Sequence, residues 1–353
     1  MRFPMILIAL AGSFSCLAKD PVSLKVMTRN MDAGTDFNLV LAATDPASFA
    51  QGTAATLAEV EAANIPARAA RLADEIAAEL PDIVGLQEVT LWRTGPLSAQ
   101  PAGAATVLFD QLDLLTSELA KRQLHYGVIA VNSLTDVEVP VPADNLNLRL
   151  TDRDAVLARI DFNQSGLDIY NVQTHRYQVA LPLGAVSPLL AGNNVYQGFI
   201  SAQVNVGGTV IRFVDTHLES PVPGNPLITI AQLAETTELL ADIGDLQTPV
   251  VLLGDFNANA EPGIDDTGTV ELVRAAGFTD VWKALNPGDP GFTWPLYGED
   301  QEAGKQVQPY ERIDLIFARG LNPAAVERIS YGAFWGAYAS DHVGVVATLQ
   351  VGN

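Results

Sequence analysis

The amino-acid sequence predicts a sandwich of mixed β-sheets covered by helices, of the α+β or α/β class. Short apolar runs typical of buried strands alternate with amphipathic helical patterns. Some neighbouring runs are joined by tight turns and others are separated by a helix, so we expect both antiparallel and parallel strand pairs. The 353 residues are 48% hydrophobic and contain no long polar linker, which predicts one domain over residues 19–353.

The first half of the chain contains four expected strands and two expected helices. The strands are rich in β-branched and aliphatic residues, as a sheet covered on both faces requires. Each helix carries apolar residues at helical spacing, and Pro66 is suited to a first helical turn. Strands are expected at 22–30, 81–89, 125–131 and 155–162, and helices at 66–80 and 109–123.

The second half begins with an expected hairpin over residues 198–219, because two alternating runs flank Gly207 and Gly208. A helix is then expected at 230–243, and strands at 250–253, 312–318 and 343–350.

The sequence GDFNA follows the strand predicted at 250–253. We expect Gly254 to end that strand. Since side chains alternate along an extended backbone, Asp255 and Asn257 should point the same way while Phe256 turns back to the core.

Residues 1–18 have the pattern of a secretory signal peptide. A basic residue, an apolar stretch too short for a membrane span, and small residues precede Lys19. We therefore expect a periplasmic or extracellular protein. Cys16 leaves lipoprotein processing as an alternative, although Ser13 stands where an aliphatic residue is usual. Cleavage after Ala18 would leave a chain without cysteine and without a disulfide.

The net charge is −21, from 41 acidic and 20 basic residues. Such a charge favours solubility and repels polyanions at long range. This argues against a passive nucleic-acid binder but not against a local basic patch. We expect a monomer.

Polar residues end or interrupt many of the apolar runs. Loops at strand ends carry side chains outward from a fixed backbone, so these residues are candidates for a functional site. They are Asn30, Glu88, His217, Asp255, Asn257, Asp314, Asp341 and His342.

The chemistry of this set favours phosphoryl transfer. Glu88, Asp341 and the amide oxygen of Asn30 are hard oxygen ligands, few in number, as suits a magnesium ion that keeps several waters. The chain has four histidines and one cysteine, so a closed zinc site is not expected. The two histidines of the set can transfer protons near neutral pH, and Asp314 can fix the tautomer of one.

Six motifs in order resemble the endonuclease/exonuclease/phosphatase superfamily: TRN, LQEV, DTHLE, GDFNA, RIDLIF and SDH. The resemblance extends from about Leu24 to Leu349. It implies the fold of pancreatic deoxyribonuclease, a four-layer α/β/β/α sandwich of two mixed sheets covered by helices. It also implies a metal-dependent phosphoesterase.

The resemblance further implies catalytic roles for five residues. Asp255 would orient or deprotonate the attacking water, and Asn257 would hydrogen-bond a phosphoryl oxygen. His342, oriented by Asp314, would be a base or an electrostatic partner. His217 would stabilise or protonate the leaving group.

It also implies a metal site. Glu88 would bind Mg²⁺, for which Mn²⁺ can substitute, and Asn30 would assist. Asp341 would lie at the same ion or at a second one.

Several charged residues have simpler interpretations. Asp314 can be a structural acid paired with Arg312, while His125 and His175 match no motif and are expected to be ordinary residues. One charged cluster offers a phosphate-contacting arginine or an acid that orients His217, but a solvated loop is the favoured interpretation. This cluster contains Arg149, Asp152, Arg153, Asp154 and Arg159.

Some segments depart from the family pattern and bear on the substrate. Residues 32–65 are an extra Ala-rich stretch, and residues 179–196 are an apolar insertion that either packs over the sheet or makes transient membrane contact as a lid. Trp92 and Arg93 follow Glu88 and could contact a nucleic-acid base, a lipid headgroup or only the core. Gln197 replaces an arginine that relatives often carry.

Three hypotheses for function remain. The first is a nuclease-type phosphodiester hydrolase, which should have a basic strip and a steep salt dependence. The second is a sphingomyelinase- or phospholipase C-like headgroup phosphodiesterase, which should bind vesicles. The third is an inactive binding protein on the same scaffold, which should lack a catalytic residue; no motif residue is missing.

Overall fold

The structure is a computed structural model that describes residues 22–98, 103–160, 167–221, 225–244, 247–261, 267–296, 307–329 and 338–352. The predicted signal peptide, with Cys16, lies outside these ranges. In the described ranges, no helix has both the length and the apolar character that crossing a membrane requires.

The first sheet has the strand order β15-β16-β1-β2-β6-β3-β4, and β5 also pairs with β6. Its parallel pair is β1 and β2, and its other pairs are antiparallel. The bounds are β1 Val22–Asn30, β2 Ile83–Gln87, β3 Leu91–Pro96, β4 Thr106–Asp110, β5 Tyr126–Val141, β6 Leu146–Arg159, β15 Asn322–Ile329 and β16 Gly344–Val351.

The second sheet has the order β13-β14-β12-β11-β10-β7, with β11 and β12 parallel. The predicted hairpin is its β10–β11 pair. The bounds are β7 Leu167–Arg176, β10 Gly198–Val206, β11 Thr209–His217, β12 Val250–Asp255, β13 Thr279–Asp280 and β14 Asp314–Arg319; a separate short pair is β8 Leu181–Pro182 with β9 Asn194–Val195.

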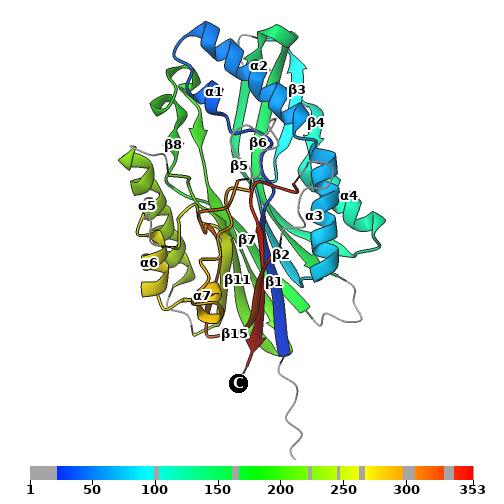
Figure 1. The fold of residues 1–353 in the computed structure, drawn as a ribbon, viewed down its shortest axis with the longest axis vertical. Helices are drawn as coiled ribbons and strands as arrows, with labels where there is room; N and C mark the ends of the chain where they lie inside the picture. Colours follow the sequence, from blue (N-terminus) through cyan, green and yellow to red (C-terminus); the bar gives the residue numbers. More distant parts are fainter. Residues whose placement is uncertain are drawn as a thin grey trace, which may run out of the picture.

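Helices cover the outer face of each sheet (Figure 1). Leu72 and Leu115, from α3 and α4, pack on the first sheet, whereas Leu239 and Val270, from α5 and α6, pack on the second. A third apolar cluster lies between the sheets. The predicted four-layer α/β/β/α sandwich is confirmed. The helices are α1 Asn38–Leu41, α2 Pro46–Ala62, α3 Ile65–Glu79, α4 Gln111–Lys121, α5 Pro226–Ile243, α6 Thr269–Ala275 and α7 Val281–Leu285, with 3₁₀ turns at Pro142–Asp144, Leu183–Ala185 and Pro188–Leu190.

The Ala-rich stretch 32–65 contains α1 and α2, which the sequence analysis did not predict. Asp45 caps α2 and accepts hydrogen bonds from the N–H groups of Ala47 and Ser48. Leu57 and Val60 of this helix join a separate core with Trp92, so Trp92 is a core residue. Trp92 Nε1 also donates to the carbonyl of Ala33 at 3.0 Å.

The insertion 179–196 packs against this same end of the molecule. Leu183 and Leu190 are buried, and Ser187 Oγ donates to the carbonyl of Ala43 at 3.1 Å. These contacts support the packing interpretation of the insertion. None of its large apolar side chains, all of which lie in the described residues, is among the strongly exposed ones.

Two expectations about local structure were wrong. The strand β12 continues through Gly254, whose φ is +144°, and ends at Asp255. The charged cluster at 149–159 is not a solvated loop, because these residues belong to β6 and Asp154 is fully buried.

Candidate active site

The site residues lie where the two parallel strand pairs end. Asn30 at the end of β1 is paired with Gln87, directly before Glu88. His217 at the end of β11 is paired with Asp255 at the end of β12. Because the carboxyl ends of parallel strands meet at one edge, each sheet brings two of these segments together.

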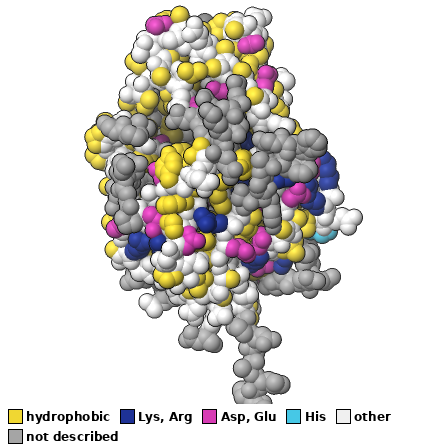
Figure 2. Space-filling view, viewed as in Figure 1, with side chains coloured by type: hydrophobic (Ala, Val, Ile, Leu, Met, Phe, Trp, Pro, Cys, Tyr) yellow, Lys and Arg dark blue, Asp and Glu magenta, His cyan; other side chains and the backbone are white. Residues whose placement is uncertain are grey.

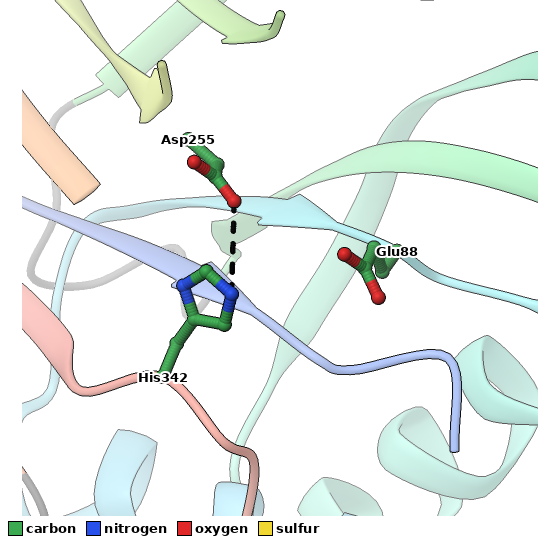
Figure 3. A group of neighbouring side chains, drawn as sticks. All are labelled: Glu88, Asp255 and His342. Atoms are coloured by element: carbon green, nitrogen blue, oxygen red, sulfur yellow. Dashed lines mark ion pairs between the residues drawn. The ribbon is translucent and has the colours of Figure 1, made fainter. Parts of the chain in front are cut away.

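Two antiparallel strands bring the remaining residues to the same place. Asp314 begins β14 and is paired with Asp255. The start of β16 lies beside the end of β1, and His342 stands two residues before that start. Figure 3 shows Glu88, Asp255 and His342 converging from three separate segments.

Asp255 lies at the centre of the cluster and is 1% exposed. Its Oδ1 accepts a hydrogen bond from the N–H of Asn257 at 2.9 Å, and its Oδ2 accepts one from Asn30 Nδ2 at 2.9 Å. The same Oδ2 lies 3.8 Å from His342 Nε2 and 4.0 Å from His217 Nε2. Burial raises the pKa of Asp255 to about 6, although nearby His342 opposes this rise.

Asn257 reaches the site by a turn and not by continued strand alternation. Its φ is +46°, which takes the chain out of the extended conformation. Its side-chain amide donates to the carbonyl of Leu218 at 2.9 Å and lies 3.2 Å from His217 Nε2. Phe256, between Asp255 and Asn257 in the sequence, is fully buried, as predicted.

His342 and Asp314 form a close buried pair. Nδ1 of His342 is 2.9 Å from Asp314 Oδ2, which fixes the ring with Nε2 toward Asp255. Burial alone would lower the pKa of His342, but Asp314, Asp341 and Asp255 raise it well above its ordinary value. The surrounding aspartates therefore favour the protonated ring, which suits an electrostatic partner better than a base. The alternative pairing of Asp314 with Arg312 is wrong: the Arg312 guanidinium binds Glu261 and Asp280.

His217 has an acidic partner that the motifs did not identify. Oδ1 of Asp154 lies 3.7 Å from His217 Nδ1, an ion-pair distance, and both Asp154 oxygens are buried without a hydrogen-bond partner among the described residues. Burial opposes protonation of His217, but Asp154 and Asp255 raise its pKa well above the ordinary value. The charged cluster in the sequence therefore contained the acid that faces His217. Strand alternation, which leaves Asp152 and Asp154 on one face, was the signal that could have found it.

Glu88 is held by its surroundings in the left-handed region, at φ +53°. Its Oε2 accepts the N–H of Ala33 at 2.7 Å, and its Oε1 accepts Asn30 Nδ2 at 2.9 Å. Asn30 thus presents its amide nitrogen to Glu88 and Asp255, while its oxygen accepts the N–H of Asp32 at 2.8 Å. In this arrangement Asn30 spaces two carboxylates.

Among the described residues, one group has potential ligand atoms within 4.8 Å of one another: Glu88, Asp255 and His342. Two hard carboxylates suit a magnesium-like cation, whereas the protonated His342 ring suits it poorly. Asp341, predicted as a ligand, is not in this group. Its Oδ2 accepts Trp294 Nε1 at 3.0 Å, and its Oδ1 lies 3.9 Å from His342 Nε2.

Two histidines outside the site behave as expected of ordinary residues. His125 is exposed. His175 Nε2 is 2.7 Å from Glu238 Oε1, and its ring packs on Phe199.

Comparisons with known proteins support the fold. Several solved structures share the fold at TM-scores above 0.5. An endonuclease/exonuclease/phosphatase protein from Beutenbergia cavernae is 22% identical, with 94% of this chain and 72% of that chain covered and a TM-score of 0.55. TDP2 from D. rerio, complexed with a single-strand DNA product, is 18% identical, with 93% and 99% covered and a TM-score of 0.54. A family protein from Leptotrichia buccalis is 16% identical, with 93% and 100% covered and a TM-score of 0.53.

No curated protein matches the sequence. The profile of the Endonuclease/Exonuclease/phosphatase family, however, matches residues 50–342. That range contains every candidate site residue except Asn30. The chain therefore belongs to the endonuclease/exonuclease/phosphatase family, whose members are generally phosphoester hydrolases that depend on a divalent metal.

Proposed function

We propose that this protein is an exported, magnesium-dependent phosphodiester hydrolase of the nuclease type. One observation supports this most strongly: the Asp255 carboxylate stands between two histidines, each with a buried aspartate on its far side. Such an arrangement can activate water on one side of a phosphate and stabilise negative charge around it.

Each residue has a distinct task in this proposal. Asp255 accepts the proton of the attacking water. His342, held protonated by Asp314, stabilises the phosphoryl oxygens, and Asn257 donates a hydrogen bond to one of them. His217 provides the proton for the leaving oxygen, since Asp154 and Asp255 raise its pKa and so favour its protonated form.

Glu88 would hold the cation, beside the Asp255 carboxylate that accepts the proton. When bound, a magnesium ion neutralises nonbridging oxygens of the phosphate and favours attack. Asn30 keeps the two carboxylates apart and oriented through its two 2.9 Å hydrogen bonds.

A nucleic-acid substrate is supported by the similarity to TDP2, which was solved with a single-strand DNA product. The charge distribution favours a second candidate, a lipid headgroup phosphodiester. The net charge is −21, and two arginines of β6 are paired with acids of the same protein: Arg149 binds Asp136, and Arg153 binds Asp110. On the face in Figure 2, the described Lys and Arg side chains occur in small separate groups beside acidic ones.

Hydrolysis assays separate these candidates. The purified protein would be given single-stranded DNA, RNA, sphingomyelin vesicles and bis-p-nitrophenyl phosphate, each with magnesium and with chelator. We expect magnesium-dependent cleavage of bis-p-nitrophenyl phosphate and of one natural substrate. Cleavage of no diester at any metal concentration would refute the proposed function.

Export is a separate part of the proposal. We expect the N-terminus of the protein recovered from its host to lie near Lys19. Recovery of cytoplasmic protein that retains Met1 would contradict it.

A further inference from the structure

Helix α3 buries charges where it packs on the first sheet. Arg68 and Glu75 of this helix are 4% and 2% exposed, and Arg29 of β1 is 1% exposed. A helix that covers a sheet normally buries apolar side chains, because removing charges from water is costly even when they are paired. These three charges therefore call for a reason beyond stability.

Arg29 bridges the helix and the active-site segment. It directly precedes Asn30, so its side chain points to the opposite face of the sheet, toward α3. Its Nε and Nη2 donate to the Glu75 carboxylate at 2.9 and 3.2 Å. Its Nη1 donates to the backbone carbonyl of His342 at 2.5 Å.

Arg68 repeats this arrangement two helical turns earlier. Residues seven apart lie on the same face of a helix, so Arg68 and Glu75 both face the sheet. Nη2 of Arg68 donates to the carbonyls of Met31 and Asp32 at 2.7 and 3.1 Å, and Nε donates to that of Ala339 at 3.3 Å. Helix α3 thus ties the segment after Asn30 to the segment that carries His342.

The segment 339–342 lies outside the sheet, and the backbones of Asp341 and Val343 beside His342 bond to those of Leu296 and Thr293. Strand β16 begins at Gly344, so the ladder with β1 does not hold His342. The N–H of His342 donates to Ser340 Oγ within its own loop at 3.1 Å. The bond from Arg29 is therefore a link between the His342 backbone and the rigid sheet.

We propose that Arg29, oriented by Glu75, is a positioning residue that sets the place of His342 relative to Asp255. The inference rests on the proposed function. A displacement of about 1 Å in a reacting group costs on the order of 100-fold in rate, and the 3.8 Å spacing of His342 and Asp255 depends on where the His342 backbone lies.

A double variant separates positioning from stability. Arg29→Met alone removes the two hydrogen bonds that Arg29 donates to the buried Glu75 carboxylate and is expected to destabilise the fold. Arg29→Met with Glu75→Leu removes both charges, and apolar replacement of a buried ion pair is often neutral for stability. We expect its thermal midpoint to be near that of the unchanged protein, while kcat on bis-p-nitrophenyl phosphate falls about 10- to 100-fold with little change in KM.

Arg29→Lys is the conservative variant. A lysine keeps the charge opposite Glu75 but lacks the planar fork that reaches Glu75 and His342 together. We expect Arg29→Lys to fold and to show the same decrease in kcat as the double variant. Arg149→Lys is the matched control, because it also breaks a two-bond contact with a carboxylate, that of Asp136 at 2.7 and 2.6 Å. Its kcat should stay unchanged.

The proton on Nδ1 of His342 gives a readout without substrate. Its hydrogen bond to Asp314 should give a resolved downfield NMR signal, assigned by its loss in Asp314→Asn. We expect this signal to shift or broaden in both Arg29 variants and to stay in place in Arg149→Lys.

Unchanged kcat and an unchanged signal in either folded Arg29 variant would overturn the positioning role. If the protein without substitutions has no activity, the proposed function is refuted instead. The NMR comparison would still decide whether Arg29 positions His342.

Discussion

A strand-end aspartate can serve as a turn residue or as a catalytic residue, and in Asp255 these two roles belong to different atoms of one side chain. Oδ1 closes the turn by accepting the N–H of Asn257, whereas Oδ2 faces Asn30 and both histidines. The frequent occurrence of strand-end aspartates in turns therefore does not count against a catalytic role of Asp255. Only substitutions that keep the turn can separate the two roles.

Asp255→Asn keeps an oxygen that can close the turn but removes the carboxylate. We expect kcat to fall by a factor of about 100 to 10,000, as is typical when a general base is lost. Asn257→Asp should be at least as harmful, because it places a carboxylate beside an anionic phosphate. Thermal midpoints measured on the same preparations should change little; normal turnover with a lowered midpoint would assign the pair to the turn alone.

The activity should depend on the ionisation of Asp255. Burial raises its pKa to about 6, so the carboxylate is lost as the pH falls through that value. We expect kcat/KM to decline about tenfold per pH unit below this point. Added magnesium favours the charged carboxylate and should move the decline to lower pH. A profile that is flat from neutrality to pH values well below 6 at low magnesium would contradict the role of Asp255 as base.

Glu88→Gln tests the metal site. The variant keeps the shape of the side chain and one acceptor for Asn30, but it removes a negative charge from the group of Glu88, Asp255 and His342. We expect a higher magnesium concentration for half-maximal activity, a thermal midpoint that falls only slightly without metal because the N–H of Ala33 loses its acceptor, and recovery of part of kcat at high magnesium. Equal magnesium requirements in the two proteins would remove Glu88 from the metal site.

At the scale of elements, the sequence correctly predicted the strands that consist of continuous apolar runs. The strands β1, β2, β12, β14 and β16 were all expected, and the polar residues at their ends converge in the structure. The sequence did not predict α2, since its Ala-rich composition lacks a clear apolar stripe. It also misassigned Asp154, because a fully buried aspartate in a strand contradicts the rule that charges lie in solvated loops. A buried charge of this kind can mark a functional site. Here only the contact of Asp154 with His217 in the structure identifies that site.

Gly254 lets the parallel strands β11 and β12 meet closely at the site. A Cβ at this position would lie 1.8 Å from the carbonyl oxygen of Thr216, and the φ of +144° disfavours other residues. We expect Gly254→Ala to lower the free energy of unfolding by at least about 2 kcal/mol and to reduce kcat, because Asp255 is the next residue. Gly288→Ala is the control, since a Cβ there meets no atom within 4 Å. Denaturant unfolding that gives equal stabilities for both variants would show that the strands can separate at low cost.

At the scale of the whole molecule, net charge and local site chemistry oppose each other. A protein with a charge of −21 repels a polyanion until the polyanion reaches the cation-binding site. Typical nucleic-acid binders have the opposite property and lose affinity steeply as salt rises.

We therefore expect an unusual salt dependence for single-stranded DNA. Raising sodium chloride from about 20 to 200 mM at fixed magnesium shortens the screening length, and kcat/KM should rise or stay level. The small diester bis-p-nitrophenyl phosphate is the control and should show little change. A steep fall for DNA alone would reveal a basic surface that attracts the strand.

The pairing of β1 with β16 joins the two ends of the described chain, with Val22 opposite Val351 (Figure 1). Strand β16 is thus the last of the described strands in the sequence, and His342 precedes it by two residues. A nascent chain that lacks this strand has an open edge at β1 and no complete site, and contacts of such high sequence separation form slowly. A product of translation that stops before Gly344 is therefore expected to lack hydrolytic activity.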